Sequence, residues 1–168
     1  MSIPLLNLDP ADYTAVLLTA LGMDDYVVDT EYFVPVSGKW YRYVYNPGND
    51  TIVAGDVVGY FSTTPAFGHV SSTAASIRVE TITSSGYTAG VGVHSIATLK
   101  CGFIQTGGPC TNITTDTNVA ATSALVMDGT TDRAAPLAAG EEMLVFGQAL
   151  EADASTVLAK ARLWLAGR

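Results

Sequence analysis

Few side chains in this 168-residue sequence are suited to catalysis. The chain has two histidines, His69 and His94, and two cysteines, Cys101 and Cys110. A Cys-His pair can act as nucleophile and base when the fold brings the side chains together, and spacing alone does not exclude this. However, the segment from Gly90 to Gly108 has the pattern of two strands joined by a turn, and this accounts for each of its residues.

Metal and cofactor sites are not indicated by the sequence. Zinc sites usually take three or four His, Cys or carboxylate ligands with one closely spaced pair, and no two of the four residues above lie within four positions. The acidic stretches "GEE" and "DGTTD" do not complete a calcium loop. The glycine-rich "GYTAGVG" is followed by no GKS or GKT and opens no GxGxxG helix. We expect no catalytic residues, no metal and no cofactor, so the chain is not predicted to be an enzyme.

A disulfide is also not expected. If Gly107-Gly108 were the centre of a two-residue hairpin turn, Cys101 would lie opposite residue 114 and not opposite Cys110. Two cysteines are too few for a disulfide framework. We expect two reduced, half-buried thiols in a protein assembled in a cytosol.

Composition and charge exclude several classes of partner. Sixteen acidic residues against eight basic ones give a net charge of −8, and no two basic residues are adjacent. Nucleic-acid binding needs clustered basic side chains, so we expect none. The N-terminus lacks a basic region, and its apolar run is far below the roughly 20 residues that span a bilayer. We expect neither export nor membrane anchoring.

The N-terminal 38 residues are predicted to form an arm and one short helix. Asp9 suits a helix N-cap, Pro10 the first helical position and Gly22 the end of the helix. The preceding "SIPLLNL" is apolar without a nearby partner strand, so we expect an extended arm that contacts another chain. Its candidate interface residues are Ile3, Pro4, Leu5, Leu6 and Leu8.

Residues 39–168 are predicted to form one β-rich domain. Trp40, Arg42 and Val44 alternate with Tyr41, Tyr43 and Tyr45, which is a strong strand pattern. Further strands are expected over 51–63, with an interruption at 54–56, over 74–84, and on both sides of a turn at Asp128-Gly129. The aromatic residues of the first strand form a candidate contact cluster for sugar stacking, of which one face must be core: Trp40, Tyr41, Tyr43 and Tyr45.

The last segments, 141–150 and 156–165, are also predicted to be strands. In the second segment, alternate residues fall on two sides. One side has Val157, Ala159, Ala161, Leu163 and Leu165, and the other has Leu158, Lys160, Arg162 and Trp164. A helix remains an alternative there, because Leu, Ala, Lys and Arg favour helices. We favour a strand because the basic residues share one alternate face.

Three stretches in this order resemble small virion proteins of tailed bacteriophages: "YRYVYNPGNDTIVAGDVVGY", "AGVGVHSIATLKCGFIQTGG" and "AAGEEMLVFGQALEADASTVLAKARLWL". The matching pattern is a "YxYVxN…AGxVVxY" strand pair, a "GVxVxxI…xxGFIQxGG" hairpin and a final "GxALEA…V…L" strand. The match extends over roughly residues 40 to 168. Its motifs are those of strands and turns.

The resemblance implies a capsid decoration, or cement, protein. Such a protein is β-rich and commonly trimeric, and it binds the outer surface of the expanded shell, where it clamps major capsid subunits together. The resemblance thus implies a homotrimer that is made in the bacterial host cytoplasm, occupies the virion surface and has the major capsid protein as its partner. It also implies turns or bulges at Gly90, Gly92, Gly102, Gly107 and Gly108, with Phe103 and Ile104 packed around them.

The expected fold is mainly β, an antiparallel barrel or a jelly-roll-like sandwich. Two other function classes remain open at this point. One is a receptor- or glycan-binding module of a head fibre or tail spike, which would use exposed members of the aromatic cluster. The other is an enzyme that uses His94.

Overall fold

The computed structural model describes residues 16–17, 28–47, 50–60, 70–71, 88–116, 118–128, 131, 133–140, 144–153, 156–158 and 160–164. The predicted arm over residues 1–8 and the predicted strand over 74–84 lie outside these residues. His69 lies outside them as well.

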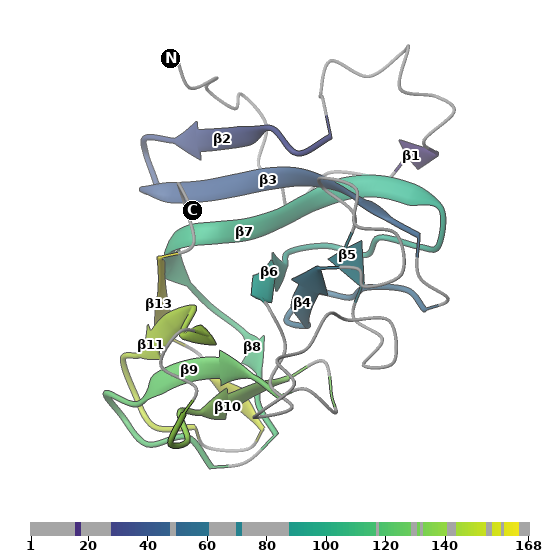
Figure 1. Cartoon of the computed structure of the whole chain (residues 1–168). Helices are drawn as coiled ribbons and strands as arrows, with labels where there is room; N and C mark the ends of the chain where they lie inside the picture. Colours follow the sequence, from purple (N-terminus) through teal and green to yellow (C-terminus); the bar gives the residue numbers. More distant parts are fainter. Residues whose placement is uncertain are drawn as a thin grey trace.

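The described residues form a mainly β structure, as predicted (Figure 1). Eleven strands make one sheet, and two more make a small second sheet; every pair of strands is antiparallel. Within the described part of the chain the main sheet follows an open path from β10 to β5, and no closed barrel forms. The strands are β1 (Val16–Leu17), β2 (Glu31–Val34), β3 (Lys39–Asn46), β4 (Val57–Tyr60), β5 (Val70–Ser71), β6 (Thr88–Gly92), β7 (Lys100–Cys110), β8 (Ile113–Thr114), β9 (Ala124–Met127), β10 (Ala134–Pro136), β11 (Gly147–Ala149), β12 (Val157–Leu158) and β13 (Ala161–Trp164).

The long strand β7 organises the sheet. One edge of β7 pairs with β3 from Lys100 to Gly107. The other edge pairs in turn with β1 at residues 100–101, β6 at 104–105 and β13 at 107–110. In Figure 1, β7 extends from the β3 layer, past β6, to the group of strands that contains β13. Strand β7 therefore connects β3 with β6 and with the C-terminal strand β13.

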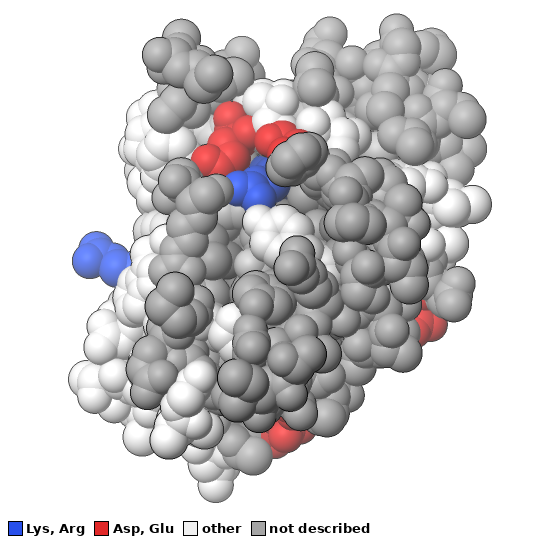
Figure 2. Space-filling view, viewed as in Figure 1, with Lys and Arg blue, Asp and Glu red and all other residues white. Residues whose placement is uncertain are grey.

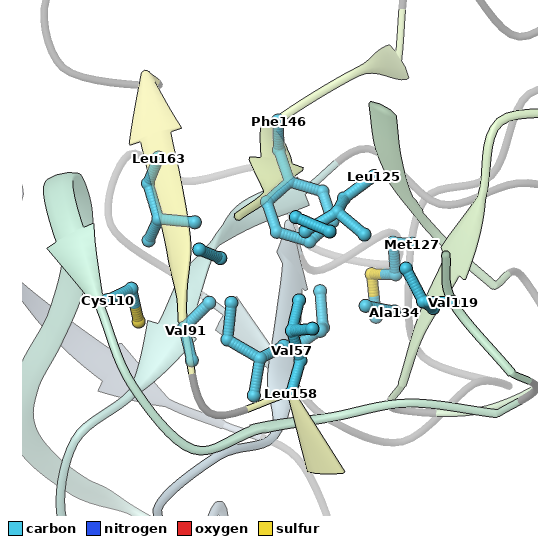
Figure 3. Close-up of a cluster of buried hydrophobic side chains, with 13 residues drawn as sticks. Val57, Val91, Cys110, Val119, Leu125, Met127, Ala134, Phe146, Leu158 and Leu163 are labelled. Atoms are coloured by element: carbon cyan, nitrogen blue, oxygen red, sulfur yellow. The ribbon is translucent and has the colours of Figure 1, made fainter. Parts of the chain in front are cut away.

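Three clusters of buried apolar side chains lie around this sheet. One is centred on Tyr43 and Phe103, a second on Val44 and Ile104. The alternation of residues along β3 and β7 directs the side chains into these two clusters, because successive residues point to opposite faces. The third cluster joins β4 and β6 to the C-terminal strands, as Figure 3 shows for Val57, Val91, Cys110, Val119, Leu125, Met127, Ala134, Phe146, Leu158 and Leu163.

The predicted N-terminal helix is not confirmed. Of its residues, the structure describes Val16 and Leu17, and these form β1, which pairs with Cys101 and Lys100 of β7. At Cys101 and Lys100 the edge of β7 opposite β3 pairs with these two residues, and this backbone pairing outweighs the helix preference of the local sequence. Among the described residues there is no α-helix.

Two predicted breaks fall at other places in the structure. Gly107-Gly108 does not end its strand, because β7 continues to Cys110. The turn that precedes β7 lies at residues 98–99, within the predicted turn "ATLK". The last predicted strand is in fact two, β12 and β13, which pair with different partners. Across this break the buried side changes: Leu158 is buried and Val157 exposed, whereas Leu163 is buried and Trp164 exposed.

Other predictions are confirmed. The chain turns at Ala54-Gly55 before β4, and β9 and β10 form an antiparallel pair on either side of Asp128. Of the predicted strand over 141–150, Gly147–Ala149 is a strand. One prediction needs correction: the segment 1–38, predicted as an arm with one short helix, contains the strand β2, which pairs with β3 along its whole length.

Candidate functional site

His94 has a structural position between β6 and β7. Its side chain is 7% exposed. Its Nε2 accepts a hydrogen bond from the backbone N–H of Phe103 at 2.9 Å, and its Nδ1 lies 3.1 Å from the carbonyl oxygen of Ser95. These contacts select the neutral ring with the proton on Nδ1. Burial lowers the pKa of His94, although the Ser95 carbonyl opposes this. An Nε2 that accepts a backbone N–H does not serve as a general base.

The two cysteines lie in different clusters of buried side chains. Both are free thiols; Cys101 packs with Tyr43 and Phe103, whereas Cys110 packs with the C-terminal strands. Burial raises the pKa of Cys110 to about 12, outweighing the opposing effects of Lys39 and the Thr111 carbonyl. Because the thiolate is the nucleophilic form, Cys110 is inert at neutral pH.

The described residues offer no group of three His, Cys, Asp or Glu side chains arranged to hold a metal ion. None of the elements in the described part of the chain is a helix long and apolar enough to cross a membrane.

The structure divides the predicted aromatic cluster. Tyr41 and Tyr43 are 4% and 0% exposed and belong to the core, where Tyr43 contacts Phe103 with ring centroids 4.9 Å apart. Trp40 and Tyr45 are half-buried. The arm residues Ile3, Pro4, Leu5, Leu6 and Leu8 lie outside the described residues.

A different aromatic arrangement crosses four strands. Trp40 of β3 and Trp164 of β13 are both register partners of Gly107, one on each edge of β7. The register between β3 and β7 shifts between Trp40 and Tyr41, so Trp40 pairs with Gly107 across a β-bulge in β7. Phe33 of β2 is in turn the partner of Trp40, and their ring centroids lie 4.8 Å apart. Directly opposed residues in antiparallel strands lie on the same face of the sheet. Phe33, Trp40, Gly107 and Trp164 therefore form one row, which we call the aromatic row.

The sequence alone did not reveal this row. Trp164 stands near the end of the chain, and its position opposite Gly107 depends on the pairing of β13 with β7. The one signal available was that Trp40 and Trp164 are the only tryptophans in the chain.

A charged cluster lies close to the row on β2 and β3. Arg42 is 7% exposed; it donates to Glu31 Oε1 at 2.9 Å and to the Tyr60 hydroxyl at 2.7 Å, and its Nε lies 3.8 Å from Asp29. Burial by itself lowers the pKa of Arg42, but the interactions with Tyr60 and Glu31 outweigh this effect and raise the pKa above its ordinary value. Arg42 thus ties β3 to both β2 and β4.

Arg42 is already engaged by Glu31, Asp29 and Tyr60, although its buried Nε makes no hydrogen bond, so we do not take this cluster as a ligand site. Charged side chains are sparse elsewhere in the same view: Figure 2 shows a few acidic and basic groups among described atoms that are mostly uncharged.

Comparisons with known proteins give a likeness to a solved structure. No family model matches the chain, and no curated protein matches it. Among solved structures, the chain is similar to the N base of the head fibre protein gp8.5 of bacteriophage phi29, with a TM-score of 0.47 and 12% sequence identity. The match covers 74% of this chain and 92% of that chain.

Proposed function

We propose that this chain is a structural virion protein of a tailed bacteriophage, which binds the outer surface of the capsid and stabilises contacts between major capsid subunits. Its partner is the major capsid protein, and its working form is a homotrimer. The proposal starts from the three sequence stretches that resemble phage decoration proteins.

The observation that carries the proposal is the place of these stretches in the fold. The first contains β3 and β4, the second β6 and β7, and the third β11, β12 and β13. The strands β3, β6 and β13 pair directly with β7, while β4 and β11 pair with β6 and β13. Apart from β12, which pairs with β8 in the small second sheet, the strands of the three stretches thus form one connected assembly around β7, as expected if they specify a common scaffold.

The chemistry of the described residues fits a binding role. His94 and both thiols are held in the core, and Arg42 is engaged by Glu31 and Tyr60. A protein that reinforces a shell needs a stable scaffold and an exposed contact surface, and it needs no activated nucleophile.

The test uses phage particles that lack this protein and the purified full-length chain. The chain is added back, and bound protein is measured by co-sedimentation and particle survival on heating. We expect saturable binding and greater heat resistance. Failure of the chain to bind the particles, or binding without any gain in heat resistance, would contradict the proposed function.

The role of the N-terminal arm is tested in the same assay. Deletion of residues 1–8 is expected to abolish shell binding while the fold, followed by circular dichroism and urea unfolding, stays intact. Unchanged binding by the truncated chain would refute the arm as a contact element and leave the rest of the proposal standing.

A further inference from the structure

The aromatic row ends in exposed apolar groups. Trp164 keeps 39% of its surface exposed, and Phe33 and Trp40 are half-buried. Beside them, the turn that joins β2 to β3 presents Val36, which is 100% exposed. Exposed single apolar residues are common, but tryptophans that share a sheet row with a further aromatic side chain form an area of the kind used for association.

Unpaired positive charge accompanies this area. Of the six Lys and Arg residues that the structure describes, Arg42, Arg133 and Lys160 are in ion pairs. In the described part of the chain, Lys39, Lys100 and Arg162 have no ion-pair partner.

One of these three unpaired cations belongs to the same region. Arg162 is two residues before Trp164 and is the register partner of Pro109. Lys39 lies on the opposite face of the sheet, because it is the register partner of Val34, which packs against the Tyr43 and Phe103 cluster. Arg162 and Trp164 are both exposed, alternating with buried Ala161 and Leu163. On a chain of net charge −8, this region combines apolar, aromatic and positive groups.

The scaffold beneath the region is rigid. A Cβ on Gly108 would overlap the carbonyl oxygen of Gly38, so the β2–β3 turn packs directly against β7. The turn is closed by the N–H of Gly38, which donates to the Val34 carbonyl oxygen at 2.9 Å. A preorganised surface loses little conformational entropy on binding.

We propose that this region is the rigid contact surface for an acidic, apolar-centred patch on the major capsid protein. Its members are Phe33, Val36, Trp40, Arg162 and Trp164. Tryptophan and arginine are the residues that most often dominate binding energy at protein interfaces, and the unpaired charge of Arg162 favours a partner of opposite charge. The inference rests on the proposed function for the identity of the partner.

The experiment compares variants of the full-length chain in binding to particles that lack it. Trp164→Ala removes the exposed indole, and Arg162→Glu reverses one unpaired charge. The matched controls are Leu150→Ala, which truncates a 53% exposed apolar side chain away from the row, and Lys100→Glu, which reverses an unpaired charge at the opposite end of β7. Urea unfolding confirms that all four variants are folded.

We expect Trp164→Ala and Arg162→Glu each to weaken binding by about tenfold or more, whereas the two controls stay close to the wild type. Raising the salt concentration is expected to weaken wild-type binding more than that of Arg162→Glu, because salt screens charge attraction.

The outcomes separate this inference from the proposed function. If the wild-type chain does not bind the particles, the proposed function fails and the partner assigned here fails with it. If the wild type binds and the two variants bind equally well, the proposed function stands and the contact surface is wrong. If Trp164→Ala leaves particle binding intact but abolishes retention on host polysaccharide, the surface binds glycan and the assigned partner is wrong.

Discussion

His94 accepts the backbone N–H of Phe103 through Nε2 at 2.9 Å, and this contact joins the end of β6 to the centre of β7. The bond exists while the ring is neutral, because a protonated Nε2 has no lone pair to accept it. A residue that resembled a catalytic histidine in the sequence therefore holds two strands together.

Acid should weaken the fold through His94. Its pKa is lowered by burial, so the unfolded chain binds the proton more readily than the folded one. The stabilisation is fully present above the ordinary histidine value of 6.5 and decreases as the pH falls below it. Urea unfolding at pH 7.5 and pH 5 measures this change.

The control for this prediction is His94→Gln, which does not titrate. Since carboxylates also titrate in acid, the informative quantity is the difference in pH dependence between the two proteins. We expect the wild type to lose about 1 kcal/mol more than the variant between these two pH values. Equal losses would contradict the role assigned to His94.

Gly108 should tolerate no side chain. Its φ is +82° and a Cβ would overlap the Gly38 carbonyl oxygen, which belongs to backbone and cannot move aside cheaply. Gly108→Ala is expected to cost about 3 kcal/mol of unfolding free energy from backbone strain and steric overlap together.

Gly38→Ala is the matched control for Gly108. Gly38 has a similar φ of +65°, but nothing lies within 4 Å of its Cβ position. It should cost about 1 kcal/mol from backbone strain alone. Equal costs for the two substitutions, measured by urea unfolding, would show that the β2–β3 turn does not pack on β7.

Loss of one partner of Arg42 should destabilise the sheet. Glu31→Ala leaves a largely buried guanidinium without its closest carboxylate, and we expect a cost of about 2 kcal/mol. The comparison is Glu151→Ala, which removes the partner of Lys160 in an exposed pair and should cost under about 0.5 kcal/mol. Similar costs in thermal or urea unfolding would contradict the structural role of Arg42.

The thiols should be unreactive in the folded protein. Cys101 is completely buried and so shielded from reagents, and burial raises the pKa of Cys110 to about 12, so Cys110 supplies little thiolate at neutral pH while folded. With an aromatic disulfide reagent we expect slow reaction in buffer and prompt reaction of two thiols per chain in denaturant. Rapid labelling of the native protein would show that these clusters open readily.

The sequence predicted the strands that have a clear local pattern. The alternation over residues 40–45 and the turn residues at 54–55 and 128 identified β3, β4 and the β9–β10 pair. The contacts that depend on strand register could not be predicted in this way. Gly107 and Gly108 resembled a turn, whereas both lie within β7, and Gly108 is needed where the β2–β3 turn packs against that strand.

Less of the candidate surface could be predicted. Of the predicted contact cluster, Trp40 and Tyr45 are half-buried, whereas Tyr41 and Tyr43 are core residues. Strand β3 is covered on both faces, so alternation along it does not separate an exposed side from a buried one. Trp164 joins Trp40 through its pairing with Gly107, and no local pattern contains that information.

Decoration of a phage capsid by this chain is tested by its copy number in purified virions. Quantitative mass spectrometry compares it with the major capsid protein in the same particles. We expect a ratio near one, which on an icosahedral shell means on the order of hundreds of copies at symmetry-related sites. A handful of copies would indicate a fibre, spike or tail component, and absence from the virion would contradict a decoration role.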